Sequence, residues 1–338
     1  MIYTGRGSTA LWAVLSALKQ PGAGVIVPAN ICEIVPAVIL RAGWRPVFCD
    51  VDPISGNAGV EHLAAARTPD TVGAIAVANF GTPVAIDEVR QWATTNGIFL
   101  IEDVCNALGA THQGRLLGTW GDAAIFSFGY AKIVEHRTGG AVTVADRRLR
   151  ARVEEIIASM PLFGLPHAAA GRALQAELRI VRGSPRLQTR EVYLPLYDRY
   201  VNDCWYRSGP DDIAAISTAC ELLPENLRRR REIAALYEAG IRHDAVAFRP
   251  RVAGDAFWRF TFTVAATLRD RWLEALRAER VLASAWYPSI AHLFGREAAV
   301  GDHPGAEQFG DRVINLFTDD RVSYEDAART VAVINQFA

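Results

Sequence analysis

Hydrophobic positions along the first half of the chain follow two alternating patterns. Short continuous apolar runs, which are typical of buried strands, occupy residues 25–27, 46–52, 74–77, 98–103, 123–128 and 140–144. Between them, apolar residues recur at helical spacing over residues 12–18, 34–41, 86–95 and 147–157. Strands that alternate with helices in this order predict right-handed βαβ units, and therefore an α/β structure with a largely parallel sheet.

The pattern changes after residue 157. Between Pro161 and Trp205 it becomes irregular, with glycine, proline and aromatic residues interspersed among arginines. Helical spacing returns over residues 213–240, 269–279 and 324–337, and a strand-like run covers residues 260–264. We therefore predict a large α/β domain over residues 1–240 and a small C-terminal α/β domain over residues 241–338.

Composition limits the classes of function. The chain has 338 residues, of which 50% are hydrophobic, so it can bury a large core. Its formal net charge of −1 gives no general attraction to nucleic acid or to an anionic membrane. The sequence shows neither a leader peptide nor an apolar run of the roughly 18 residues that span a membrane. We expect a soluble, cytoplasmic protein with no nucleic-acid or membrane partner.

The cysteines and histidines do not form a recognisable metal motif. The five cysteines are scattered at Cys32, Cys49, Cys105, Cys204 and Cys220, with no C-x-x-C pair. No histidine stands at the spacing of a zinc ligand. We therefore expect reduced thiols and no metal.

Lys132 is the most distinctive candidate for chemistry. It is one of two lysines, with Lys19, in a chain that has 36 basic residues. Arginine has replaced lysine almost everywhere, which suggests that Lys132 performs a task that a guanidinium cannot. Formation of a Schiff base is such a task, because only an amine can lose its proton and attack a carbonyl. The alternative is an ordinary surface lysine.

The surroundings of Lys132 favour the functional interpretation. The predicted strand at residues 123–128 contains Ser127, and Lys132 follows five residues later in the loop. The pair Gly139 and Gly140 then opens the next strand. Loops at the carboxyl ends of strands form the ligand crevice of α/β sheets. A hydroxyl suited to a phosphate and an amine suited to an aldehyde would thus face the same crevice.

These residues carry a resemblance to a known family. Glu102-Asp103, then Ser127-Phe128, Lys132 and Gly139-Gly140 resemble the motif of the DegT/DnrJ/EryC1/StrS sugar aminotransferases. The resemblance extends over nearly the whole chain. It implies a fold type I transferase that uses pyridoxal 5'-phosphate (PLP), with a mostly parallel seven-stranded sheet. It also implies helices that bridge the two domains over residues 213–240, and a homodimer.

The resemblance assigns roles to individual residues. Lys132 would form the Schiff base with PLP and move the proton. Asp103 would pair with the pyridine nitrogen, and Asn106 would contact the ring oxygen. Physical reasoning supports Asp103, because a carboxylate at the end of an apolar strand needs a cationic partner, although it could instead cap the next helix. The phosphate would bind Ser127 and a helix start formed by Gly7, Ser8 and Thr9, which is otherwise a simple helix cap.

Several positions depart from the family pattern. Cys32 stands where an aromatic residue usually stacks on PLP, and Ile133 follows the lysine where asparagine is usual. Cys32 is either a small packed residue or chemically active. Trp205 replaces the asparagine that precedes Tyr206 and Arg207, so the contact that this element makes with the neighbouring subunit's phosphate is in question.

Other residues are candidates for substrate binding. The resemblance suggests Arg137, Arg207, Tyr287 and His292 for this role. The irregular segment adds arginines that could clamp a diphosphate or a carboxylate, or form a solvated helix face: Arg172, Arg179, Arg182, Arg186 and Arg190.

The resemblance implies a PLP-dependent aminotransferase. It would transfer an amino group from an amino-acid donor, such as glutamate, to a small carbonyl acceptor, a keto sugar linked to a nucleotide, in secondary-metabolite or cell-surface sugar biosynthesis. Three alternatives remain open. The first is a PLP-dependent elimination or dehydration. The second is a non-sugar substrate, such as a cyclitol or an amino acid. The third is a non-catalytic, PLP-binding regulatory protein.

Overall fold

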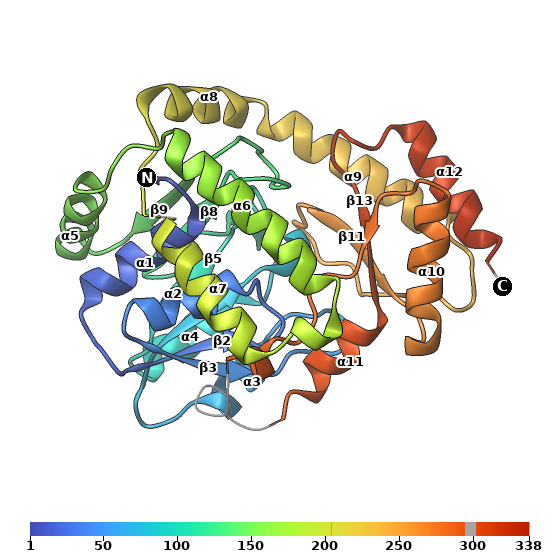
Figure 1. The fold of residues 1–338 in the computed structure, drawn as a ribbon. Coiled ribbons are helices and arrows are strands. Elements are labelled where there is room, and N and C mark those ends of the chain that lie inside the picture. The colour runs from blue at the N-terminus through green and yellow to red at the C-terminus, as the bar shows by residue number, and fades with distance from the viewer. Residues whose placement is uncertain (204, 295–301, 338) are drawn as a thin grey trace.

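The computed structural model describes residues 1–203, 205–294 and 302–337 and contains two main sheets (Figure 1). Within these residues the larger sheet has seven strands in the order β1-β9-β8-β5-β4-β2-β3. Neighbouring strands from β8 to β3 are parallel, whereas β9 runs antiparallel to both β8 and β1. The predicted α/β class and mostly parallel seven-stranded sheet are confirmed.

The elements of the larger sheet follow the predicted alternation. Its strands are β1 (Ile2–Thr4), β2 (Gly24–Pro28), β3 (Arg45–Cys49), β4 (Thr71–Val77), β5 (Phe99–Asp103), β8 (Ala123–Ser127) and β9 (Gly140–Val144). The helices between and after them are α1 (Gly7–Leu18), α2 (Ile34–Arg41), α3 (Val60–Ala66), α4 (Ile86–Thr95) and α5 (Arg147–Ala158). Helix α1 packs against α2 and α5, and α3 packs against α4. Strand β2 is buried at every position, as expected for a parallel strand that is covered on both faces.

The second sheet is smaller and antiparallel. Its order is β10 (Ala247–Phe248), β11 (Arg259–Thr263), β13 (Val313–Phe317) and β12 (Ala283–Ser284). The helices of this half are α8 (Pro210–Glu221), α9 (Leu223–Gly240), α10 (Ala266–Ala278), α11 (Pro304–Arg312) and α12 (Tyr324–Asn335). Helix α9 runs from the larger sheet to the smaller one and packs against α12 (Figure 1). A separate apolar core forms here around residues such as Ile233, Phe262 and Leu316.

The boundary at residue 240 stays a prediction. Trp258, Tyr287 and Phe309 follow it in the sequence, yet their side chains belong to the larger apolar core. A two-stranded hairpin, β6 (Thr111–His112) with β7 (Arg115–Leu116), lies outside both main sheets.

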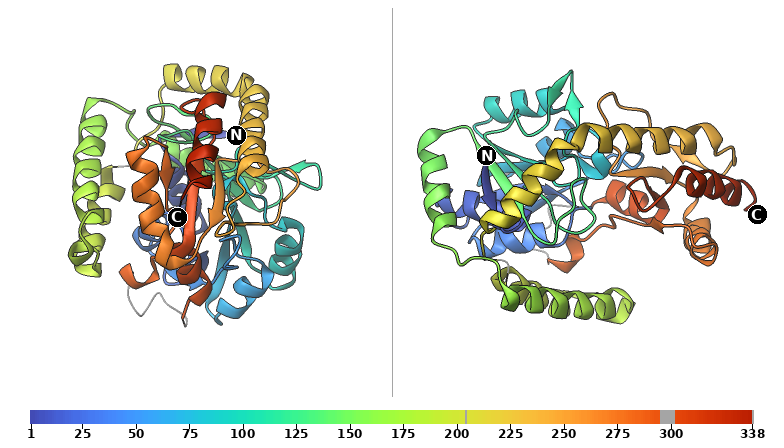
Figure 2. Two further views of the ribbon diagram at one scale, coloured as in Figure 1. Left: turned by 90° about the vertical axis from the view of Figure 1, so that its right-hand side faces the viewer. Right: turned by 90° about the horizontal axis from the view of Figure 1, so that it is seen from above.

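The segment between Pro161 and Trp205 is helical, although its sequence pattern is irregular. It forms α6 (Leu165–Arg182) and α7 (Arg190–Asp203), which pack together, and α7 also packs on α2. Helix α6 lies along an outer margin of the molecule (Figure 2). Gly171 and Pro195 interrupt the helical pattern in the sequence. The buried stripe of Leu174, Leu178 and Val181 nevertheless keeps helical spacing and stabilises α6.

Within the described residues, no helix is long and apolar enough to cross a membrane. In the same residues, no group of three or more acidic, histidine or cysteine side chains could hold a metal ion. Cys32, Cys49, Cys105 and Cys220 are free thiols. Cys204 lies outside the described residues.

Glu102 is a charged residue inside the otherwise apolar strand β5. Its carboxylate is 3% exposed and accepts hydrogen bonds from the backbone amides of Gly118, Trp120 and Gly121, at 2.7, 2.6 and 2.7 Å. A carboxylate with this many donors satisfies a tight turn that would otherwise leave buried amides unpaired. Glu102 therefore fixes the loop that leads into β8.

We expect Glu102→Gln to lower the free energy of unfolding by about 2–3 kcal/mol, because an amide nitrogen would face backbone donors. Chemical denaturation of the cofactor-free protein measures this. Glu155→Gln, which makes the same change at an exposed position of α5, should alter stability by less than about 0.5 kcal/mol. Equal denaturation midpoints for the two variants would contradict the prediction.

Candidate active site

A cavity of about 1240 Å³ opens at the carboxyl ends of β5 and β8, between the start of α1 and helix α6. This is the crevice expected for an α/β sheet. Nine of the predicted site residues line it: Gly7, Ser8, Cys32, Asp103, Asn106, Ser127, Lys132, Arg137 and Tyr287. Thr9 is completely buried in α1, directly after the lining residue Ser8. The structure thus brings together residues that are up to 280 positions apart in the sequence.

Lys132 lies in the loop after β8, where the backbone has an unusual conformation. Ala131 has φ = 59°, in the left-handed region that residues other than glycine seldom adopt. The indole nitrogen of Trp258 donates a hydrogen bond to the carbonyl of Ala131, and the carboxylate of Glu135 accepts one from its amide at 2.9 Å. These contacts hold a conformation that is costly by itself, and so fix where the side chain of Lys132 begins.

The amine of Lys132 is also held at its other end. Its Nζ donates to Oδ1 of Asn106 at 2.8 Å and lies 5.8 Å from the centre of the Trp258 ring. Nδ2 of Asn106 in turn donates to the hydroxyl of Tyr287 at 3.1 Å. Burial raises the pKa of Tyr287, so its phenol stays protonated at neutral pH. Tyr287 and Asn106 together set the direction in which the amine of Lys132 points.

Asp103 is the last residue of β5. It is buried, with 7% of its surface exposed. Its Oδ1 accepts a hydrogen bond from the amide of Cys105 at 2.9 Å. No cationic side chain of the described residues forms an ion pair with it. A buried carboxylate without a cation is unfavourable, so this position fits a protonated pyridine nitrogen from a ligand.

The start of α1, which also lines the cavity, suits a phosphate. Helix α1 begins at Gly7, and the side chain of the preceding residue, Arg6, does not cap its amides. A Cβ atom at Gly7 would come within 2.9 Å of Sγ of Cys105 and 3.2 Å of Cβ of Ser127. The absence of a side chain at Gly7 therefore lets the helix start lie close to Cys105 and Ser127. The amides of a helix start, a nearby hydroxyl and the positive end of the helix dipole are features that bind phosphate.

The residues present thus fit PLP. Asp103 would hold the ring nitrogen, Lys132 the aldehyde carbon, and Ser127 with the start of α1 the phosphate. Asn106 now contacts Lys132, and its predicted contact with the ring oxygen stays a prediction. The individual roles of Gly7, Ser8 and Thr9 stay predictions as well.

The two departures from the family pattern differ in position. Cys32 lines the cavity, and burial together with the nearby Glu33 raises the pKa of its thiol. Ile133 is 2% exposed and belongs to the apolar core, while its carbonyl accepts a hydrogen bond from Asn226 at 2.9 Å. Ile133 therefore serves packing, and Cys32 leaves room where a larger side chain could stand.

The candidate substrate residues are not equally close to the cavity. Arg137 lines it, and its Nε and Nη2 donate to Oδ1 of Asp212 at 3.0 and 2.9 Å. Arg207 is outside the lining and donates to the carbonyl of Met160 at 3.1 Å. His292 is exposed on the short helix η3 (Ala291–Leu293), also outside the lining. The substrate roles of all three stay predictions.

The structure also sorts the arginines of the segment between Pro161 and Trp205. Arg172 and Arg179 project from α6 and line the cavity. Arg182 instead pairs with Glu33 at 3.1 Å. Arg186 and Arg190 are exposed and lie outside the lining.

Some residues of the site were not predicted. Trp258 and Tyr200 approach the cavity from distant parts of the sequence, and no local pattern marks them. Arg6 has a local signal, because a basic residue precedes the helix start where a capping residue such as serine is usual.

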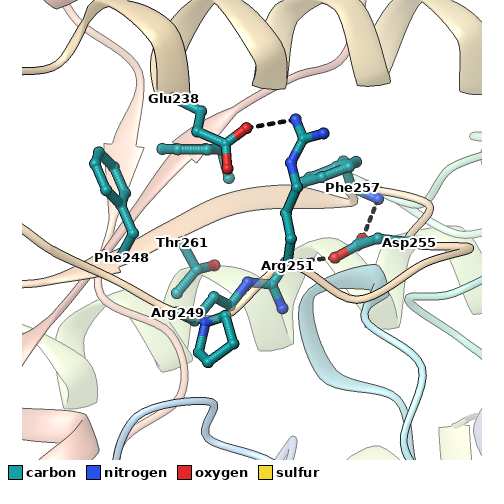
Figure 3. A pocket seen from close by; sticks show the side chains of 9 residues that line it. Glu238, Phe248, Arg249, Arg251, Asp255, Phe257 and Thr261 are labelled. Atoms are coloured by element: carbon teal, nitrogen blue, oxygen red, sulfur yellow. Dashed lines mark hydrogen bonds and ion pairs between the residues drawn. The ribbon is translucent and has the colours of Figure 1, made fainter.

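A second cavity is too small for a cofactor. It lies beside β10 and β11 and has a volume of about 20 Å³, enough for about one water molecule. Figure 3 shows Arg251 paired with Glu238, and Asp255 bound to the amide of Phe257. Arg249 also pairs with Asp255, at 2.7 Å. The charged side chains that line this small cavity thus pair with one another, and we interpret the cavity as a packing feature of the smaller sheet.

Comparison with known proteins is consistent with this site. The model of the DegT/DnrJ/EryC1/StrS aminotransferase family matches residues 1–197 and 210–335. A dTDP-4-dehydro-2,3,6-trideoxy-D-glucose 4-aminotransferase from Saccharopolyspora spinosa is 26% identical over 86% of this chain and 72% of its own length. A dTDP-4-dehydro-2,6-dideoxy-D-glucose 3-dehydratase from the same organism is 32% identical, over 44% of this chain and 34% of its own length.

A solved structure supports the fold. The aminotransferase TlmJ from Streptoalloteichus hindustanus superposes with a TM-score of 0.80 at 24% identity, over 99% of this chain and 84% of that one. The family match covers nearly all of the sequence, and the matched ranges include Lys132, Asp103 and the start of α1. The chain therefore belongs to the DegT/DnrJ/EryC1/StrS aminotransferase family and is an aminotransferase that uses PLP.

Proposed function

We propose that the protein transfers an amino group from an amino-acid donor, glutamate in the simplest case, to the carbonyl group of a nucleotide-linked keto sugar. The charge of the cavity carries this proposal. Asp103 is the sole carboxylate among the described residues that line it, whereas Arg172 and Arg179 add positive charge on α6. These two arginines exceed what one cofactor phosphate requires and suit a second anion, such as a diphosphate. The similar enzyme from Saccharopolyspora spinosa is named for a dTDP-linked sugar.

The residues of the chain divide the chemistry among them. Bound PLP supplies an electron sink for the carbon that loses its proton. Nζ of Lys132 would hold the cofactor and would be the base that takes up and returns the proton. Asp103 would hold the pyridine nitrogen in its protonated form. Asn106, oriented by Tyr287, holds the amine of Lys132 in the cavity through its 2.8 Å hydrogen bond.

We also propose that the protein acts as a homodimer in the cytoplasm. Tyr130 and Leu165 lie at the cavity and are 79% and 85% exposed. Large exposed apolar side chains beside a binding cavity favour coverage by another subunit. Free thiols at Cys49 and Cys220 are in keeping with a reducing compartment.

The first experiment compares the visible absorption of PLP bound to the wild type, Lys132→Arg and Lys19→Arg. We expect a band in the wild type and in Lys19→Arg that glutamate removes. Lys132→Arg should show no band, because a guanidinium cannot form the covalent bond. Transfer to a dTDP-linked keto sugar is then followed by mass spectrometry of the aminated product.

The other outcomes separate the alternatives. A band that no amino acid changes would favour a non-catalytic, PLP-binding protein. Loss of water from the sugar without a new amine would favour dehydration, which the similarity to a dehydratase makes the second candidate. No band in the wild type would contradict the cofactor assignment itself.

The two arginines of α6 provide a test of the acceptor. We expect Arg172→Gln and Arg179→Gln each to raise KM for the nucleotide-linked sugar by about tenfold, through loss of a charged hydrogen bond. The reaction with glutamate alone, followed at the visible band, should stay unchanged. Arg186→Gln removes an equal charge outside the cavity and should leave KM unchanged. Unaltered KM in both α6 variants would contradict a diphosphate-bearing acceptor at this place.

Cys32 tests whether the unusual residue takes part in the chemistry. Because burial raises the pKa of its thiol, the reactive thiolate is scarce at neutral pH. We expect Cys32→Ser to keep activity within about threefold. Alkylation of Cys32 by iodoacetamide at pH 7.5 should be slower than that of free cysteine, and should accelerate only above the ordinary thiol pKa. Rapid labelling at pH 7.5 together with an inactive serine variant would show a chemical role.

A further inference from the structure

Arg6 occupies the position before helix α1 where a capping side chain normally stands. Its backbone is extended, with φ = −155° and ψ = 164°, and its side chain makes no hydrogen bond to the amides of the helix. A guanidinium has no acceptor atom, so it cannot cap a helix. It also adds positive charge at the positive end of the helix dipole. The first turn of α1 contains no acidic residue that would compensate.

The side chain of Arg6 is nevertheless held in a defined place. Its Nε donates a hydrogen bond to the hydroxyl of Tyr206 at 2.6 Å, and its Nη1 donates to the hydroxyl of Tyr200. Its Cζ lies 5.3 Å from the centre of the Tyr200 ring and 5.9 Å from that of Tyr206. The hydroxyl of Thr138 also donates to the hydroxyl of Tyr206, at 3.3 Å. The two tyrosine hydroxyls orient the guanidinium without adding negative charge.

Arg6 lines the cavity beside the helix start that would bind the phosphate. It lines the same cavity as Ser8 and Ser127, and its backbone pairs with Gly139, just before the strand that flanks Ser127. An anion between Arg6 and the start of α1 would be attracted by both the guanidinium and the helix dipole. The phosphate of PLP is such an anion, and it must bind in this cavity if Lys132 holds the aldehyde carbon.

We propose that Arg6 is the cation that neutralises the phosphate of PLP from within the same subunit. The start of α1 and Ser127 complete this phosphate site. Tyr200 and Tyr206 are positioning residues, because they act on the phosphate through Arg6. The proposal depends on the cofactor and not on the identity of donor or acceptor.

The element around Tyr206 and Arg207 supports a contact within one chain. The amide of Gly5 donates to the carbonyl of Tyr206 at 3.0 Å, and a Cβ at Gly5 would come within 2.2 Å of the Tyr206 ring. Arg207 is occupied with the carbonyl of Met160. Tyr206 thus packs closely against the start of its own chain and brings its hydroxyl to Arg6.

The experiment compares PLP with pyridoxal, which has the same ring and aldehyde but no phosphate. Both dissociation constants are measured by titration of the visible band in the wild type, Arg6→Gln and Arg6→Lys. We expect Arg6→Gln to raise the dissociation constant of PLP by about 10- to 100-fold, which is the effect of losing one charge-assisted contact. The dissociation constant of pyridoxal should change by less than about twofold. Arg6→Lys should raise the dissociation constant of PLP by an intermediate factor. Inorganic phosphate should compete with PLP less strongly in Arg6→Gln than in the wild type.

Two further variants keep the result interpretable. Arg199→Gln removes a charge next to Tyr200 in the sequence, but Arg199 is exposed and pairs with Glu177. The PLP affinity of this variant should therefore equal that of the wild type. Tyr200→Phe keeps the guanidinium and removes one of its two anchors. Tyr200→Phe should raise the dissociation constant of PLP by about three- to tenfold and leave that of pyridoxal unchanged. This variant keeps the test decisive even if Arg6→Gln folds poorly. Circular dichroism establishes that each variant is folded.

If Arg6→Gln and Tyr200→Phe lose affinity for PLP and for pyridoxal by the same factor, the proposal is overturned, because Arg6 would then only support the structure. Unchanged PLP affinity in both folded variants would also overturn it. Neither result affects the assignment of PLP itself, which depends on the band of the wild type and its absence in Lys132→Arg.

Discussion

The buried carboxylate of Asp103 is the feature on which the arrangement of the site depends. The chain supplies it with an amide hydrogen bond from Cys105 but, among the described residues, with no cation. Burial of a charge without a partner is unfavourable, so this carboxylate favours a ligand with a cationic group. In the proposed site Asp103 would hold the ring nitrogen, and Lys132 would hold the aldehyde carbon.

Lys132 depends on parts of the chain that are far apart in sequence. Trp258 binds the carbonyl that precedes it, Asn106 binds its amine, and Asn226 binds the carbonyl that follows. Trp258 and Tyr287 come from the C-terminal half, yet they pack in the core of the larger sheet. The position of the amine is therefore sensitive to how the two halves of the chain fit together. A movement of the smaller sheet would change the surroundings of Lys132 without altering any residue at the end of β8.

The sequence predicted the larger sheet well, because parallel strands that are covered on both faces leave continuous apolar runs such as β2 and β4. Lys132 could be predicted because so few lysines remain in the chain. Helix α6 was missed because Gly171 disrupts its pattern, while tertiary packing overrides this local preference. The contact between Arg6 and Tyr206 spans 200 residues, so no local pattern can reveal it.

The charges of the cavity match the polarity of the ligand that it is built to hold. PLP with a protonated ring is positive at the pyridine nitrogen and negative at the phosphate. Asp103, Arg6 and the start of α1 all line the cavity, which therefore offers a carboxylate as well as a guanidinium and the positive end of a helix dipole. Complementary charges favour a ligand orientation that pairs each charged group with its opposite. Arg172 and Arg179 on α6 line the same cavity and add positive charge to it. The electrostatics that would attract the phosphate of the cofactor would therefore also attract an anionic acceptor.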